Sequence, residues 1–292
     1  MTFLDPRSDI VFKKLFGSKA HKNILMSFLN AVLEREEGNL IIDVTINDPH
    51  NVPETPLSKI SIVDVRCTDQ KQNHYILEMQ VANQADYAAR AQYYSSLALS
   101  RQLSTGESYS QLVPVIFVGV LDFSLFKTKN YISHHFIRDN ETNAHELKHL
   151  EFHFIELEKF NKHDHELTSL VDKWIFFLKH AASLKQIPQT LHETVLEDAF
   201  TILAQGSWSR TELEAYDRYL DAIRSAKSQL ETAEEIGREK GIAAGEARGE
   251  RKKAIDMAQK LLNVLDVTSI AQISGLTIEE VEALKKNDSH KK

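Results

Sequence analysis

The chain has 292 residues, of which 42% are hydrophobic and 26% are charged, and its formal net charge is −7 at pH 7. This length can bury one large core and a smaller one, and the acidic balance disfavours a protein that holds nucleic acid through bulk positive charge, while leaving room for a local basic cleft. The single cysteine, Cys67, excludes a framework of intramolecular disulfides and favours a reducing, cytoplasmic location.

The sequence carries no pattern typical of membrane insertion or export. No apolar run approaches the length of a bilayer span. The first residues, MTFLDPR, lack the basic region and apolar core of a signal peptide. We therefore expect a cytoplasmic protein without membrane contact.

Two amphipathic helices are predicted at the start of the chain. The first begins at Asp5, with proline in its first turn, and ends at Gly17. The second covers 21–34, with apolar residues at helical spacing. Asp9 and Lys13 are four residues apart and can share a helix face, which is equally compatible with a simple surface ion pair.

A β-hairpin is the next predicted element. A strand at 40–46 and a loop at 48–58 lead into two runs of β-forming residues, 59–67 and 74–81, joined by the polar turn 68–73. Successive side chains of a strand point to opposite faces.

Each hairpin strand places a carboxylate among apolar residues. Asp64 shares a face with Ile62, and Glu78 shares a face with Ile76 and Gln80. Burying an unpaired carboxylate is costly, so these groups need a cation, a basic partner or a shared proton. Two oxygen ligands on a rigid sheet suit a divalent metal such as Mg²⁺. The alternative is that both carboxylates point to solvent.

After the hairpin the pattern alternates between helix and strand. A helix at 86–103 places Arg90, Tyr94, Leu97 and Arg101 at three- and four-residue steps, so its polar side chains can lie beside the strand carboxylates or serve only in packing. An apolar run at 112–121 predicts a strand buried on both faces, and further strands are expected at 133–137 and 150–157. The order predicts an α/β fold, a mixed sheet flanked by helices.

Three of these pieces together resemble a known family. The opening DPRSDIVFKKLFG, the hairpin with Asp64 followed at fourteen residues by Glu78, and the helix with Arg90 followed by PVIFVGVLDF are similar to the recombination-promoting nuclease (Rpn) or putative transposase family of the PD-(D/E)xK nuclease superfamily. The resemblance covers about the first 160 residues closely and the helical remainder more loosely. It implies a PD-(D/E)xK-like sheet followed by an all-helical C-terminal half.

The resemblance also implies roles for individual residues. Asp64 matches the superfamily's metal-binding aspartate, Glu78 matches the acidic residue of the D/E-x-K motif, and Asp9 matches an acidic residue often contributed by the first helix. Gln80 takes the place of the usual lysine, and Val63 takes the place of the usual proline. Glutamine can orient a water molecule but supplies no positive charge.

The activity implied by the resemblance is that of a metal-dependent DNA endonuclease in recombination, mobile-element biology or defence against foreign DNA. Mg²⁺ or another divalent cation would be held by Asp64 and Glu78, with the Met79 carbonyl as a backbone ligand. Lys13 or Arg90 would supply the missing positive charge to the phosphate. The alternative is a catalytically inactive nucleic-acid-binding or regulatory protein on the same fold, acting through its C-terminal helices.

The second half of the chain shows no catalytic pattern. We expect a nuclease core at 1–160, a helical extension at 161–227, a flexible or partly helical charged connector at 228–254, and a helical hairpin of the helix-turn-helix type at 255–292. Four glycines recur every fourth residue in the connector. Thr277 is the expected N-cap of the last helix, with Glu280 three residues later. This region could mediate self-association.

Overall fold

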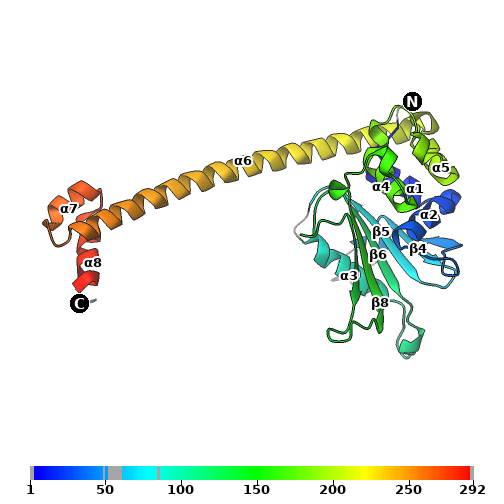
Figure 1. Cartoon of the computed structure of the whole chain (residues 1–292), viewed down its shortest axis with the longest axis horizontal. Helices are drawn as coiled ribbons and strands as arrows, with labels where there is room; N and C mark the ends of the chain where they lie inside the picture. The colour runs from blue at the N-terminus through cyan, green and yellow to red at the C-terminus, as the bar shows by residue number, and fades with distance from the viewer. Residues whose placement is uncertain (1–2, 49, 52–60, 84–85, 290–292) are drawn as a thin grey trace. The chain divides into compact units, whose positions relative to one another are not determined.

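A computed structural model describes residues 3–48, 50–51, 61–83 and 86–289 (Figure 1). By internal contacts the chain divides into two compact units, Met1–Leu220 and Asp221–Lys292. The loop predicted at 48–58 and the first residues of the strand predicted at 59–67 lie largely outside the described residues.

A six-stranded mixed sheet is the centre of the first unit. The mixed sheet predicted from the sequence is thus confirmed. The strand order is β1-β4-β5-β6-β8-β7. The central strands β5, β6 and β8 run parallel, while β1, β4 and β7 join antiparallel. The strands are β1 Val44–Asn47, β4 Val65–Asp69, β5 His74–Gln80, β6 Val115–Leu121, β7 Ile132–Ile137 and β8 Leu147–Glu156, and a separate two-stranded pair joins β2 His50–Asn51 to β3 Ser61–Ile62.

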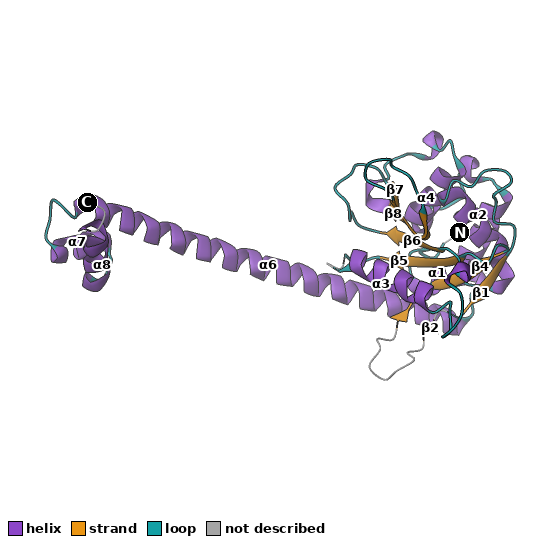
Figure 2. Ribbon diagram, turned by 90° about the horizontal axis from the view of Figure 1, so that it is seen from below, coloured by secondary structure: helices purple, strands orange, loops and turns teal. Residues whose placement is uncertain are grey.

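Helices cover the two faces of this sheet unequally (Figure 2). Four helices, together with Tyr216 from the start of α6 (Arg210–Leu261), share one buried cluster with the sheet, and a fifth helix packs against the opposite face. The first group comprises α1 Asp9–Phe16, α2 Lys22–Val32, α4 Leu170–His180 and α5 Thr194–Leu203, and the fifth is α3 Tyr87–Ser100. The predicted extension at 161–227 therefore contributes to the core of the sheet.

The larger core is built on aromatic contacts between segments far apart in sequence. Phe28 meets Trp174 edge-on with ring centroids 5.8 Å apart, and Phe177 meets Phe200 edge-on at 4.9 Å. Trp174 is fully buried and Trp208 is 6% exposed. Both tryptophans are therefore packing residues.

Several element boundaries differ from the sequence prediction, and each has a local cause. Helix α1 begins at Asp9 rather than Asp5, because the Asp5 carboxylate accepts hydrogen bonds from the backbone and side chain of Arg7 and holds a non-helical turn. Strand β1 begins at Val44 rather than Leu40, since the backbone of Ile41 is bonded to the Asn30 side chain instead of a strand.

The segment 228–254, expected to be a flexible or partly helical connector, is helical throughout. It lies within α6, Arg210–Leu261. A Cβ atom built on Gly237, Gly241, Gly245 or Gly249 would meet no atom of the described residues within 4 Å. None of the helices in the described ranges is both long enough and apolar enough to cross a membrane.

The second unit has a small core of its own. The end of α6 packs with α7 Val267–Ser274 and α8 Ile278–Ser289 around Ala258, Leu262, Ile270 and Val281. Gly275 ends α7 with φ of 72°, a conformation that glycine adopts without strain. The predicted cap of α8 is confirmed, because Thr277 N donates to the Glu280 carboxylate at 2.9 Å and Glu280 N donates to Thr277 Oγ1 at 3.2 Å.

This cap leads to a stability prediction for the second unit. Thr277→Ala should destabilise α8 by about 1 kcal/mol, because the Glu280 amide loses its acceptor. Backbone amide exchange in the first turn of α8 should then rise roughly fivefold. Thr268→Ala, an exposed threonine inside α7, is the control and should leave exchange in α8 unchanged. Equal exchange in Thr277→Ala and wild type would contradict the role of the cap.

Candidate active site

Three carboxylates from different elements line one polar cavity of about 280 Å³ in the first unit. Asp9 comes from α1, Asp64 directly precedes β4, and Glu78 belongs to β5. The full lining is Asp9, Asp64, Glu78, Met79, Gln80, Arg90 and Tyr94. The structure thus brings together the acidic residues, the backbone ligand and the amide that the sequence analysis singled out.

The strand register places Asp64 opposite Glu78. Val65 pairs with Leu77 in the antiparallel ladder, so the residue before Val65 and the residue after Leu77 are neighbours. Strand β4 begins only at Val65. The amide of Met79 is therefore bonded to a side chain instead of a strand, and it donates to Asp64 Oδ2 at 2.7 Å.

Burial and the charge of a neighbouring carboxylate raise the pKa of both Asp64 and Glu78. Desolvation is the main cause that raises the pKa of Asp64 to about 6. The neighbouring Asp9 raises this pKa further, whereas the hydrogen bond from the Met79 amide and the charge of Lys13 lower it. Desolvation raises the pKa of Glu78 to about 7, assisted by the charge of Asp64 and opposed by Arg90. Near neutral pH the two groups resist carrying full negative charge together. An added cation would relieve that repulsion.

Lys13 already places one positive charge among these carboxylates. Its Nζ lies 2.8 Å from Asp9 Oδ1 and 3.6 Å from Asp64 Oδ1. Burial alone would lower the pKa of Lys13, but the hydrogen bond and charge of Asp9, followed by those of Asp64, raise it overall. The expectation that Asp9 and Lys13 share a helix face is confirmed.

Gln80 is held by Arg90, a neighbour on the facing helix. Arg90 Nη2 donates to Gln80 Oε1 at 2.7 Å, and Gln80 Nε2 donates to the Ala82 carbonyl at 3.0 Å. The Arg90 guanidinium also lies 5.1 Å from the ring centroid of Tyr87. A fixed amide and a permanent positive charge thus lie where the family resemblance leads us to expect a lysine.

The oxygen donors of the cavity fit a hard divalent cation. Asp64 and Glu78 offer carboxylates, and the Met79 carbonyl points to the same side of β5 as its amide, toward Asp64. In the described part of the chain no group of three or more His, Cys, Asp or Glu side chains is arranged to hold a metal ion. Two carboxylates and a backbone oxygen match Mg²⁺, which keeps several waters.

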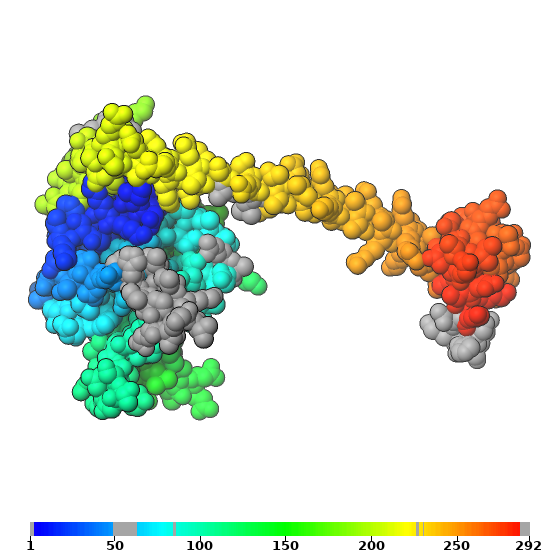
Figure 3. Space-filling model, turned by 180° about the vertical axis from the view of Figure 1, so that it is seen from behind, coloured from blue at the N-terminus to red at the C-terminus, as the bar shows by residue number. Residues whose placement is uncertain are grey.

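The sequence analysis did not identify Tyr219, a tyrosine whose pKa is influenced by Asp9. Tyr219, in the first part of α6, has a pKa raised by burial, and the charge of Asp9 raises it further while the backbone of Asp9 opposes the increase. The start of the chain and the start of α6 lie side by side in the space-filling view (Figure 3), where Lys14 Nζ is 2.7 Å from Glu212 Oε1. No local sequence signal links residues so far apart along the chain.

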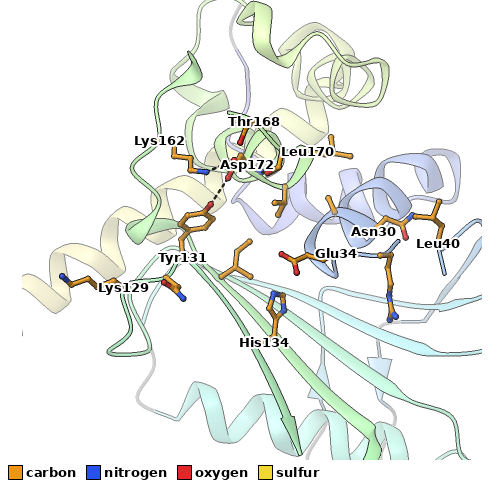
Figure 4. Close-up of a pocket in the computed structure, with 16 residues that line it drawn as sticks. Asn30, Glu34, Leu40, Lys129, Tyr131, His134, Lys162, Thr168, Leu170 and Asp172 are labelled. Carbon is orange, nitrogen blue, oxygen red and sulfur yellow. Dashed lines mark hydrogen bonds and ion pairs between the residues drawn. The ribbon is translucent and has the colours of Figure 1, made fainter. Parts of the chain in front are cut away.

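The described histidines lie outside the carboxylate cavity. His134 lines a separate cavity of about 940 Å³ (Figure 4), and its Nδ1 is 2.6 Å from Nδ1 of His153. In that cavity Asp172 is tied to Tyr131 and Lys162 by hydrogen bonds of 2.8 Å each, so this acid is neutralised by its neighbours.

Comparison with known proteins identifies a family for this chain. A family model described as PD-(D/E)XK nuclease family transposase matches residues 6–233. No curated protein and no solved structure matches the chain.

Proposed function

The chain belongs to the PD-(D/E)XK nuclease family transposases, and from this premise we propose that it is a metal-dependent DNA endonuclease with Asp64 and Glu78 as its metal ligands. One observation carries the proposal: the buried carboxylate of Glu78 in β5 lies next to the half-buried carboxylate of Asp64, which directly precedes β4, in a polar cavity that the permanent cation Arg90 also lines. Such a pair raises the free energy of the isolated protein and becomes useful when a cation is bound.

Phosphodiester hydrolysis requires an attacking hydroxide and neutralisation of the charge that develops on the phosphoryl group. A bound divalent cation would supply both effects by acidifying water and drawing charge from the phosphoryl oxygens. Asp64, Glu78 and the Met79 carbonyl would hold this cation. Asp9 lines the same cavity and adds to its negative charge.

Gln80 is the proposed group that orients the attacking water. An amide has two N–H donors and an oxygen with two lone pairs. The bonds to Arg90 and Ala82 use one donor and one lone pair, which leaves one of each for water. Because the amide is neutral, Arg90 would provide the positive charge next to the transferring phosphate.

Lys13 is the second proposed phosphate contact. Its ammonium lies within 4 Å of both Asp9 and Asp64, so a phosphate oxygen approaching the carboxylates would meet a cation rather than only negative charge. This local arrangement offsets the net acidity of the chain at the point where DNA would bind. We propose that cleavage of this kind serves recombination, mobile elements or defence against foreign DNA.

The second unit has no proposed part in the chemistry. None of its described residues lines the carboxylate cavity. It remains the predicted place of self-association.

Plasmid nicking tests the proposal directly. Purified full-length protein should convert supercoiled plasmid to open-circle or linear DNA with added Mg²⁺ or Mn²⁺, and EDTA should stop the reaction. Asp64→Ala should not cut under any of these conditions. Asp43→Ala is the matched control, because Asp43 is an exposed carboxylate paired with Lys22 and lies outside the cavity.

Failure of the folded wild-type protein to cut plasmid, single-stranded DNA or RNA with either metal would overturn the proposed activity. The alternative, a nucleic-acid-binding or regulatory protein on the same fold, would then stand. Equal cutting by wild type and Asp64→Ala would place the activity at another site or in a contaminant.

A further inference from the structure

Tyr87 is a fully buried side chain that the proposed mechanism does not use. It is the first residue of α3 and is 0% exposed. Its ring meets Phe117, Phe123 and Phe154 edge-on, with centroids 6.3 to 6.4 Å apart. These contacts fix the ring, and with it the direction of the hydroxyl.

The hydroxyl of Tyr87 has no hydrogen-bond partner among the described residues, although its oxygen is buried. Buried polar groups in folded proteins nearly always have a partner, so such an atom requires an explanation. A phenylalanine would fill the same aromatic cluster without leaving a polar atom unpaired. The presence of the oxygen therefore indicates a role beyond packing.

Gly119 shows where this hydroxyl points. A Cβ atom built on Gly119 would lie 2.8 Å from Tyr87 Oη, closer than real Cβ contacts allow. Gly119 is also the parallel register partner of Glu78 in the β5–β6 ladder. The hydroxyl thus occupies the side-chain space of residue 119 on β6, directly beside the side chain of Glu78.

The phenol keeps its proton in this position. Burial raises its pKa well above the usual value, and the charge of Glu78 raises it further. The group is therefore a donor and has a carboxylate as its neighbour. In many metal sites the carboxylate ligand is itself hydrogen-bonded by a second residue that fixes its orientation.

We propose that Tyr87 is a positioning residue for Glu78: its hydroxyl donates a hydrogen bond to the Glu78 carboxylate when that carboxylate holds a divalent cation. Residue 119 is glycine because a larger side chain there would keep the Tyr87 hydroxyl away from Glu78. This inference rests on the proposed function, because it assigns support to the same metal site. A carboxylate has two oxygens. One would face the cation and the other would accept from Tyr87.

Tyr87→Phe tests the hydroxyl alone, because the ring and its packing remain. Calorimetric titration of the full-length, metal-free protein with Mn²⁺ should show binding weakened roughly 10- to 100-fold. The melting temperature without metal should be unchanged or higher, since the variant removes an unpaired buried oxygen. Tyr109→Phe, at a tyrosine that is 83% exposed, is the control and should bind Mn²⁺ as wild type does.

Gly119→Ala tests the same atom from the other side. The added methyl would press on Tyr87 Oη, and less closely on Phe154 Cδ1 at 3.0 Å and Phe117 Cε1 at 3.2 Å. The variant should melt at a lower temperature than wild type. In the Tyr87→Phe background the loss should be smaller, because the closest atom is gone, and Mn²⁺ affinity should equal that of Tyr87→Phe alone.

The outcomes separate this inference from the proposed function. Wild-type Mn²⁺ affinity in Tyr87→Phe, with wild-type binding intact, would overturn the positioning role and leave the metal site standing. A lower melting temperature in metal-free Tyr87→Phe with unchanged affinity would assign the hydroxyl to stability and overturn the inference equally. No Mn²⁺ binding by folded wild type would overturn the proposed function, and this inference with it.

Discussion

Asp64→Asn and Glu78→Gln should each reduce metal-dependent cleavage on the order of 1,000-fold while raising the stability of the metal-free protein. The amides keep the size and shape of the side chains and remove only their charge. An amide oxygen is a poor ligand for Mg²⁺ compared with a carboxylate. Loss of activity in both variants would therefore report on charge at the site rather than on a disturbed fold.

The gain in stability has the same physical origin as the loss of activity. Desolvation raises the pKa values of Asp64 and Glu78 to about 6 and about 7, with further increases from Asp9 at Asp64 and from Asp64 at Glu78, so their charged forms are unfavourable in the metal-free fold. Removing either charge at pH 8 should stabilise the first unit on the order of 1–3 kcal/mol. Asp64→Ala and Glu78→Ala should also be inactive, with stability nearly unchanged or slightly higher.

Cleavage rates and urea unfolding on the same preparations check this prediction. The chain has two tryptophans, Trp174 and Trp208, and both are buried in the first unit. Their fluorescence therefore reports on the unit that holds the site. Asp43→Asn should leave cleavage unchanged. A marked loss of stability in Asp64→Asn or Glu78→Gln would make these carboxylates structural rather than functional.

The second large effect is a dependence of stability on pH. Without metal, the first unit should lose stability as pH rises from about 4 to about 7, the interval between the ordinary values of 3.8 and 4.5 for these carboxyls and their raised folded values. In this interval the folded state binds more protons than the unfolded state, so the free energy of unfolding falls as pH increases. The contribution of the two protonated carboxyls to the free energy of unfolding is fully present below their ordinary pKa values and is lost above their pKa values in the folded state.

Urea unfolding at a series of pH values, with and without Mg²⁺, measures this effect. The contribution of the pair is the difference between wild type and the double variant Asp64→Asn/Glu78→Gln, because other titrating groups are common to both. Wild type should become less stable relative to the double variant as pH rises. At pH 8, a cation at 100 times its dissociation constant should raise the free energy of unfolding of wild type by about 2.7 kcal/mol and so oppose this loss of stability. Parallel pH curves for the two proteins would contradict the raised pKa values.

Much of the fold and part of the site follow from local sequence patterns. The apolar run containing β6 predicts a central buried strand, and Thr277 with Glu280 predicts the cap of α8. The hairpin pattern places Asp64 and Glu78 on adjacent strands, and the four-residue step from Asp9 to Lys13 places both on one helix face. These features depend on residues close in sequence, whose geometry is set by the 3.6-residue period of a helix or the two-residue period of a strand.

Other features do not follow from local sequence patterns. The sequence could not show that α6 would continue through the glycines at 237–249, since exposed glycine weakens a helix. It also gave no signal that Tyr219 would lie near Asp9 or that Arg90 would donate a hydrogen bond to Gln80.

The sequence by itself determined which side chains the candidate site could contain: the carboxylates of Asp64 and Glu78, an acid of the first helix beside a lysine, and an amide where the family resemblance leads us to expect a lysine. The tertiary structure alone decided how these groups are supported. The Tyr87 hydroxyl lies beside Glu78 only because β6 pairs with β5 in the register that places Gly119 opposite Glu78. The sequence specifies the type of each side chain. The burial and the neighbours of that side chain, which set its pKa or leave its hydroxyl unpaired, depend on chain segments that come together only after folding.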